Sequence, residues 1–381
     1  MMERYFTGAR VLVEGALAPG KAVGVANGRI VAIVPDADIP EGASRVDMSG
    51  QMLLPGFVDV QVNGGGDRLF NADPSVDTIC AIAAAHARFG TTSLMPTLIS
   101  DDLDKVRRAI LAVDEAIEQG VPGIIGIHLE GPFLSTDRKG VHDATKFRDF
   151  LPEHVELMSS LQRGRTLVTL SPERASPAVI EALVARGVVV SAGHTNADYA
   201  TMQAALDAGV TGFTHLFNAM SPLTSREPGV VGAALQDEAS WCGIIVDGHH
   251  VSPITLQLAM RCKPADKFML VTDAMPSVGM NDGSFTLQGR KIIVSDGICR
   301  AEDGTLAGSD LDMARALRNA LAMLDVDIAT ASAMASANPA AFIGLGDDIG
   351  TLRVGARADF VALDDALHLR STWIAGEKIH E

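Results

Sequence analysis

The chain has 381 residues, of which 47% are hydrophobic and 20% are charged, and its formal net charge is -16 at pH 7. This composition excludes wholesale disorder, and the length fits one large barrel with a smaller satellite better than one small domain. The net negative charge makes nucleic acid a poor partner. It also means that an anionic substrate needs a local basic pocket, because the electrostatic field of the whole protein repels it.

The cysteines and the apolar runs bear on the compartment. The four cysteines lie far apart in the sequence, so there is no CxxC metal or redox motif, and this pattern favours a reducing compartment. The first residues lack the apolar run of a signal peptide, and the apolar runs elsewhere are too short to span a membrane. We therefore expect a cytoplasmic protein with no membrane partner.

Short β-strands are predicted near both ends of the chain, at residues 10–14, 22–26, 29–34, 359–363 and 369–374. Asn27-Gly28 is typical of a hairpin turn between two of these strands, and Ala375-Gly376-Glu377 is a further turn. Two β-rich ends around a different middle predict one small β-sandwich domain formed by both termini, residues 1–54 and 348–381.

The middle of the chain, residues 55–347, alternates between apolar runs and helical patterns. Eight apolar runs are predicted to be strands, at residues 56–62, 91–97, 124–129, 166–170, 188–192, 212–216, 242–246 and 268–272. Amphipathic stretches such as 76–89, 103–119 and 200–208 lie between most of them. This pattern predicts an α/β fold, a (β/α)8 TIM-type barrel. A Rossmann fold is weakly supported, because no GxGxxG follows the first strand.

After the eighth predicted strand, the pattern changes. Residues 283–307 are typical of an inserted β-hairpin or flap, and residues 311–324 and 328–337 are predicted to be helices.

Chemically active side chains stand where the predicted strands end. Glu130, His194, His215 and Asp273 each close a different strand, and the carboxyl ends of barrel strands meet at one mouth. One carboxylate and two imidazoles are typical of a catalytic zinc site with a position left open for water. Such a metal lowers the pKa of its water to roughly 7, and Asp273 would be the general base and later the general acid.

Each of these residues also has a structural interpretation. A single histidine at a strand end is more often a hydrogen-bonded core or loop residue, and Glu130 or Asp273 alone could cap a helix or tether a loop. The joint pattern favours a metal site, because six of the ten histidines fall at or just after predicted strand ends: His128, His142, His194, His215, His249 and His250.

Seven motifs then resemble a known family. They are, in chain order, LPGFVDVQVNGGG, HLEGPFL, SAGHTNA, THLFNAM, IVDGHHV, VTDAM and TLAGS. The first resembles the first-strand signature of the amidohydrolase superfamily. The other six, with Lys139-Gly140-Val141-His142 after HLEGPFL, resemble the N-acetylglucosamine-6-phosphate deacetylase family, in order along nearly the whole chain. The resemblance implies hydrolysis of the acetamide of N-acetylglucosamine 6-phosphate to glucosamine 6-phosphate and acetate, by a metal-bound water, in amino-sugar catabolism and cell-wall sugar recycling.

The resemblance also implies roles for individual residues. It implies one divalent metal ion per subunit, with Zn2+ as the default and Fe2+, Co2+ or Mn2+ as alternatives, held by Glu130, His194 and His215. It implies Asp273 and His142 as catalytic residues, with His142 near the substrate acetamide. It implies a substrate site and a homodimer that shares its phosphate site between subunits; the substrate-binding residues would be Val141, His142, Asn218, Ala219, Arg226, His250 and the turn Leu306-Ala307-Gly308.

The chain departs from the superfamily at the first strand. Many amidohydrolases have HxH there, and those histidines bind a second metal, but this chain has Gln61 and Asn63. Neutral amides are poorer zinc ligands than imidazoles, so we expect one metal ion and His142 as a substitute donor to the oxyanion. Two structural alternatives stay open at this point: His142 as a solvated loop residue, and Arg226 as a surface arginine paired with Glu227.

Three rival functions remain. A deacetylase of the galactosamine epimer differs by the orientation of one hydroxyl, which no motif decides. A cyclic-amide hydrolase of the same superfamily is disfavoured because such enzymes usually carry HxH. A non-catalytic sugar-binding barrel is disfavoured because the three ligand types and Asp273 are all present.

Overall fold

An eight-stranded parallel sheet forms the centre of the computed structural model, which describes residues 3–280 and 283–380. All eight predicted strands are present, in the order β17-β16-β15-β14-β13-β12-β11-β8. Their bounds are β8 (Phe57–Val62), β11 (Thr91–Ile99), β12 (Gly126–Glu130), β13 (Arg165–Leu170), β14 (Val189–Ala192), β15 (Gly212–Phe213), β16 (Trp241–Ile244) and β17 (Phe268–Leu270).

The sheet curves until its two edge strands meet. Just beyond β17, the Asp273 backbone N–H donates to the Gln61 carbonyl of β8 over 3.0 Å, and Ala274 forms a parallel bridge with Val62. These contacts bring the first and last strands together, as the predicted TIM-type barrel requires. The strands are apolar because they are buried on both faces; every residue of β11 is buried.

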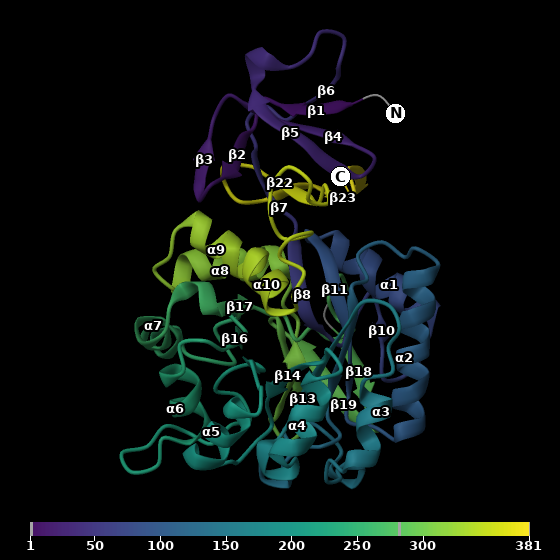
Figure 1. The fold of residues 1–381 in the computed structure, drawn as a ribbon, viewed down its shortest axis with the longest axis vertical. Coiled ribbons are helices and arrows are strands. Elements are labelled where there is room, and N and C mark those ends of the chain that lie inside the picture. The colour runs from purple at the N-terminus through teal and green to yellow at the C-terminus, as the bar shows by residue number, and fades with distance from the viewer. Residues whose placement is uncertain (1–2, 281–282, 381) are drawn as a thin grey trace.

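Helices surround the barrel (Figure 1). Their bounds are α1 (Val76–Ala87), α2 (Leu103–Glu118), α3 (Val155–Met158), α4 (Pro177–Val184), α5 (Tyr199–Asp207), α6 (Gly229–Gln236), α7 (Pro253–Cys262), α8 (Met313–Met323), α9 (Ile328–Ala335) and α10 (Ala337–Phe342). The helix predicted over 328–337 is confirmed as α9 but ends two residues earlier, because the chain leaves helical geometry at Ser336 (φ -141°, ψ -73°) and then starts α10. None of the described helices has the length and apolar content needed to cross a membrane.

Strands from both termini form two further sheets, drawn in purple and yellow at the top of Figure 1. A four-stranded sheet contains β1 (Arg4–Thr7), β4 (Lys21–Ala26), β5 (Arg29–Pro35) and β6 (Ser44–Asp47). A six-stranded sheet contains β2 (Arg10–Val13), β3 (Ala16–Ala18), β7 (Met52–Pro55), β22 (Phe360–Leu363), β23 (Leu369–Ile374) and β24 (Glu377–His380).

The two terminal sheets share an apolar core, which makes them a sandwich. Phe6 of β1 packs edge-on against Phe360 of β22, with ring centroids 4.7 Å apart, so the N- and C-terminal segments are joined in one core. The Asn27-Gly28 hairpin is confirmed: both residues have the positive φ angles, 51° and 75°, of a type I′ turn. The exact boundaries at 54/55 and 347/348 stay a prediction, and residues 1–2 and 381 of the predicted small domain lie outside the described residues.

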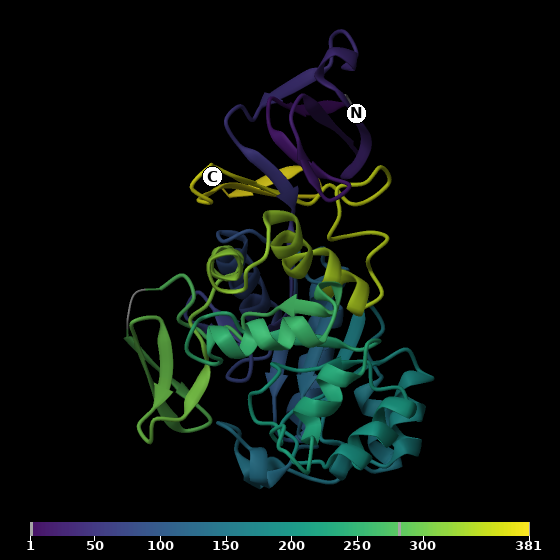
Figure 2. The ribbon, with the colours of Figure 1, turned by 90° about the vertical axis from the view of Figure 1, so that its left-hand side faces the viewer.

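The inserted segment is larger than the predicted hairpin. It is an antiparallel four-stranded sheet, the flap sheet, formed by β18 (Gly283–Leu287), β19 (Arg290–Ser295), β20 (Ile298–Ala301) and β21 (Leu306–Ser309). Figure 2 shows it in green at the left of the barrel. The predicted turn Leu306-Ala307-Gly308 is strand β21, and the turn lies just before it. Two short strands, β9 (Gly64–Gly65) and β10 (Arg68–Leu69), follow β8.

Candidate active site

The main cavity of the barrel lies where the strands end and has a volume of about 250 Å³. Glu130 ends β12, while His194, His215 and Asp273 follow β14, β15 and β17 by two or three residues. All four side chains line this cavity, as the strand-end argument predicts.

The backbone is strained where three of these side chains leave their strands. His194, His215 and Asp273 have φ angles of 49°, 35° and 51°, in the left-handed region that residues with a side chain rarely adopt. Such conformations cost free energy and persist where the surrounding structure enforces them, which is often at functional sites.

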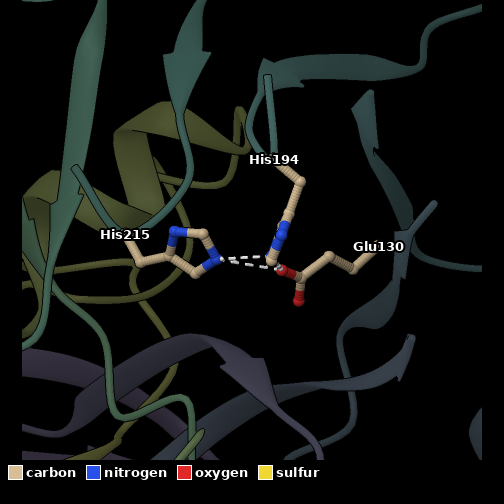
Figure 3. Close-up of side chains that lie close together, drawn as sticks. All are labelled: Glu130, His194 and His215. Atoms are coloured by element: carbon tan, nitrogen blue, oxygen red, sulfur yellow. Dashed lines mark hydrogen bonds and ion pairs between the residues drawn. The ribbon is translucent and has the colours of Figure 1, made fainter. Parts of the chain in front are cut away.

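Glu130, His194 and His215 point at one another (Figure 3). Glu130 Oε1 lies 3.0 Å from Nε2 of each histidine, and the two Nε2 atoms are 3.1 Å apart. Ligands at 2.0–2.2 Å from a tetrahedral ion lie roughly 3.3 Å from each other, so the three atoms have the spacing of one ligand shell.

The hydrogen bonding of His194 tests whether a cation fits this triangle. Its Nδ1 lies 2.8 Å from the Arg138 carbonyl, which can only accept, so Nδ1 carries the proton and a neutral ring has a lone pair on Nε2. That lone pair faces the Glu130 carboxylate, which also only accepts. Two acceptors at this distance repel unless a cation lies between them, so the donor set fits a divalent ion.

Gln61 and Asn63 occupy the floor of the site without joining the ligand triangle. The Gln61 amide donates to Glu130 Oε2 over 3.1 Å and to Asp273 Oδ1 over 3.2 Å, and the Asn63 amide donates to the same Asp273 oxygen over 2.6 Å. Both amides therefore orient carboxylates with their N–H groups, and neither belongs to the cluster of Glu130, His194 and His215.

Asp273 is suited to exchange a proton near neutral pH. Burial raises its pKa, the negative charge of Glu130 raises it further, and together they bring the pKa to about 6. A carboxylate with a pKa close to the working pH can both accept and return a proton.

His142 faces the same cavity from the loop after β12. It is buried, so the solvated-loop interpretation was wrong, and its Nε2 lies 3.9 Å from Glu130 Oε1. Burial holds its pKa well below the usual range, and the nearby His194 adds to this, so the ring is neutral. Ser100 Oγ lies 2.9 Å from His142 Nδ1 and 3.5 Å from the Glu130 carbonyl. If Ser100 donates over the shorter contact, the ring proton sits on Nε2 and faces the cavity.

Most of the substrate-binding residues predicted from the family resemblance reach this cavity. Val141, Asn218, Ala219, His250, Leu306 and Gly308 line it, whereas Ala307 is buried in the core of the flap sheet. His250 is held by Asp247, whose Oδ2 lies 2.6 Å from His250 Nδ1.

Arg226, like Ala307, stays outside the cavity lining. It is exposed on the loop before α6 and is absent from the cavity lining. The pairing with Glu227 was wrong, because the Glu227 carboxylate instead accepts the backbone N–H groups of Tyr199 and Gly229. Among the described residues that line the cavity, none is lysine or arginine.

The sequence analysis missed several residues that shape the site: Ser100, Asp247, Met275, Gln288 and Thr305. Ser100 directly follows β11, so the strand-end argument could have found it, and Asp247 directly follows a predicted strand. Gln288 carries no such signal, because it lies in a hairpin turn remote in sequence from the other site residues.

Comparisons with known proteins agree with this geometry. Residues 52–379 match the Amidohydrolase family. N-acetylgalactosamine-6-phosphate deacetylase of Shewanella sp. (strain ANA-3) is 42% identical over 98% of this chain and 95% of its own length. N-acetylglucosamine-6-phosphate deacetylase of Bos taurus is 37% identical over 98% and 95%.

A solved structure gives the same result. The N-acetyl-D-glucosamine-6-phosphate deacetylase of Mycobacterium smegmatis, in complex with N-acetyl-D-glucosamine-6-phosphate, matches with a TM-score of 0.93 and 34% identity over 100% of both chains. The barrel and the cluster of Glu130, His194 and His215 agree with these full-length matches. The chain therefore belongs to the amidohydrolase family.

Proposed function

We propose that this chain is an N-acetylglucosamine-6-phosphate deacetylase, which hydrolyses the acetamide to glucosamine 6-phosphate and acetate in amino-sugar catabolism and cell-wall sugar recycling. The observation that carries the proposal is the cavity that holds Glu130, His194, His215 and Asp273 together. Full-length relatives with this activity in their names support the choice of substrate.

The metal site would be formed by Glu130, His194 and His215, with one divalent ion per subunit. Bound there, the ion would polarise the acetamide carbonyl and increase the acidity of a water. We propose Zn2+, with Fe2+, Co2+ and Mn2+ as ions that accept the same ligands. A second tightly bound ion is not expected, because Gln61 and Asn63 direct N–H groups at carboxylates.

The protein groups then have distinct tasks. The water oxygen attacks the acetamide carbon while its proton passes to Asp273. His142 donates from Nε2 to the carbonyl oxygen as negative charge develops there. Asp273 returns the proton to the sugar nitrogen as the C–N bond breaks, so acetate and the amine leave.

We further propose a homodimer in which Arg226 from a second copy completes the phosphate site. The described residues that line the cavity include no lysine or arginine, yet the substrate would be a dianion and the chain carries a net charge of -16. Large apolar side chains are exposed near the Arg226 loop: Leu223 packs over Gly232 of α6, and α6 contacts α7, which exposes Ile254 and Leu258. An exposed apolar surface of this kind suits an interface.

A cytoplasmic location also remains a proposal. All four cysteines are unpaired, which is consistent with a reducing compartment.

A second candidate is deacetylation of the galactosamine epimer. It is favoured by the 42% identity to a relative that is named for this activity. The two epimers differ in one hydroxyl, so both substrates belong in one experiment.

Acetate release from the purified, metal-loaded protein tests the proposal. We expect turnover with N-acetylglucosamine 6-phosphate, a lower kcat/KM with the galactosamine epimer, and little with either sugar lacking phosphate. A higher kcat/KM for the epimer would make the second candidate the function. No acetate from either phosphate, with each of the four metals supplied, would exclude deacetylation of these sugars.

A further inference from the structure

We propose that Gln288, at a hairpin tip of the flap sheet, is a positioning residue for His142. The inference rests on the proposed function only in the role given to His142; the contacts themselves are independent of it. Gln288 is joined to the site by two hydrogen bonds, which we call the Gln288 latch, and its two partners are 145 and 188 residues away in sequence.

The latch connects the two segments that hold the His142 ring. Gln288 Oε1 accepts the backbone N–H of Asp143, the residue next to His142, over 2.7 Å. Gln288 Nε2 donates to the carbonyl of Ser100, whose hydroxyl contacts His142 Nδ1. One amide thus fixes both the backbone beside His142 and the residue that orients its ring.

Apolar packing brings the hairpin tip to this place. Leu287 and Ile292 of the flap sheet share a buried cluster with Ile99, which precedes Ser100, and with Val141, which precedes His142. The apolar contacts dock the flap sheet on both segments, and the directional hydrogen bonds of the latch set their position. Since Leu306 and Gly308 of β21 line the cavity, the flap sheet is a wall of the active site.

The conformation of Gln288 indicates that its side chain, rather than the turn, explains its presence. Gln288-Gly289 is a two-residue turn with φ angles of 48° and 80°, the type I′ geometry that favours asparagine, aspartate or glycine at its first position. Glutamine is a poor choice for such a turn, but its longer side chain spans the gap to both partners.

The same sheet offers a matched control. Asp296-Gly297 is another two-residue turn of this geometry, with φ angles of 54° and 74°. Asp296 is exposed, and its side chain accepts a hydrogen bond from the adjacent Ser295 hydroxyl and makes none with the described residues of the site. Asp296→Ala should therefore destabilise its turn by at least as much free energy as Gln288→Ala destabilises the other turn, but it breaks no hydrogen bond to the site.

The test compares Gln288→Ala, Gln288→Asn and Asp296→Ala. Asparagine suits the turn but is one methylene too short to make both latch bonds. We expect both Gln288 variants to lose kcat by on the order of tenfold to a hundredfold, with a smaller change in KM, because a displaced donor weakens transition-state binding first. Asp296→Ala should keep the wild-type kcat. Amide exchange at Asp143 should accelerate in the Gln288 variants alone.

Each outcome bears on the latch. Wild-type kcat in Gln288→Asn would overturn the positioning role, even if exchange at Asp143 accelerates. Unchanged exchange at Asp143 would overturn the latch itself. If the wild type releases no acetate, the proposed function fails, while the exchange measurement still decides whether the latch holds the loop. If Gln288→Ala fails to fold, Gln288→Asn carries the test.

Discussion

Glu130 and Asp273 are two carboxylates in one cavity with different hydrogen-bond partners. Glu130 Oε1 contacts both histidines, while Asp273 Oδ1 accepts only the amides of Gln61 and Asn63. Glu130→Gln should therefore reduce the bound metal first, because the triangle loses its charged ligand. Asp273→Asn should keep the metal and lose several orders of magnitude in kcat. Elemental analysis together with kinetics checks both, and turnover of Asp273→Asn within tenfold of wild type would rule out its role.

The hydrogen bond from Asn63 contributes to lowering the pKa of Asp273. Burial and the Glu130 charge raise the pKa of Asp273 to about 6, and the hydrogen bond from Asn63 opposes them. Asn63→Ala removes this bond, so the pKa should rise further. Since Asp273 must be deprotonated to accept a proton, activity is lost below its pKa. The acid limb of kcat/KM should therefore move to higher pH, with metal content unchanged, because Asn63 is outside the ligand triangle. If the acid limb does not move, it reports the titration of a group other than Asp273.

At the scale of elements, Asp59 lies where the two edge strands of the barrel sheet, β8 and β17, come together. Asp59 of β8 is fully buried there and accepts hydrogen bonds from the Thr272 hydroxyl, the Gln61 N–H and the Thr272 N–H. These bonds fix the residue before Asp273 to the first strand. Burial nevertheless dominates and raises the pKa of Asp59 from 3.8 to about 7.

The pKa of Asp59 makes a prediction for stability. Between 3.8 and about 7 the folded chain binds a proton that the unfolded chain has released, so this group stabilises the fold less as the pH rises. The thermal midpoint of wild type, relative to Asp59→Asn, should fall from pH 5 to pH 8. Asp327 caps α9 and has a pKa lowered from 3.8, so it is ionised in both states over this range, and the midpoint of wild type relative to Asp327→Asn should stay level from pH 5 to pH 8. The same trend in both variants would contradict the assignment.

At the scale of the whole molecule, the proposed dimer would supply the positive charge that the substrate phosphate needs. If Arg226 serves the cavity of a second copy, Arg226→Ala should raise KM for the phosphorylated sugar far more than for the unphosphorylated one. A charged hydrogen bond contributes roughly 1.5–3 kcal/mol, or about ten- to more than a hundredfold in binding.

Mixing two defective chains tests whether the site is shared. Heterodimers of Asp273→Asn and Arg226→Ala chains should contain one cavity with both native residues and so recover activity. A mixture of Asp273→Asn with His142→Ala is the control, because both residues line the cavity of one chain and each cavity stays defective in one of them. No recovery in proven Arg226 heterodimers would place Arg226 in its own subunit's site or outside the site.

Local sequence determined the barrel strands and the grouping of the four strand-end residues at the site. Buried parallel strands need continuous apolar runs, and all eight were predicted; the Asn27-Gly28 hairpin followed from the turn that those residues favour. Glu130, His194, His215 and Asp273 could be grouped in advance, since the closure of a barrel brings its strand ends together whatever their distance in sequence.

Tertiary structure alone decided the features that depend on contacts between remote segments. The break at Ser336, the extra strands of the flap sheet and the buried position of His142 follow from packing, which short-range patterns do not encode. Gln288 is the clearest case: its turn would suit asparagine better, and its partners, Ser100 and Asp143, lie on segments that only the docked flap sheet brings within hydrogen-bond distance.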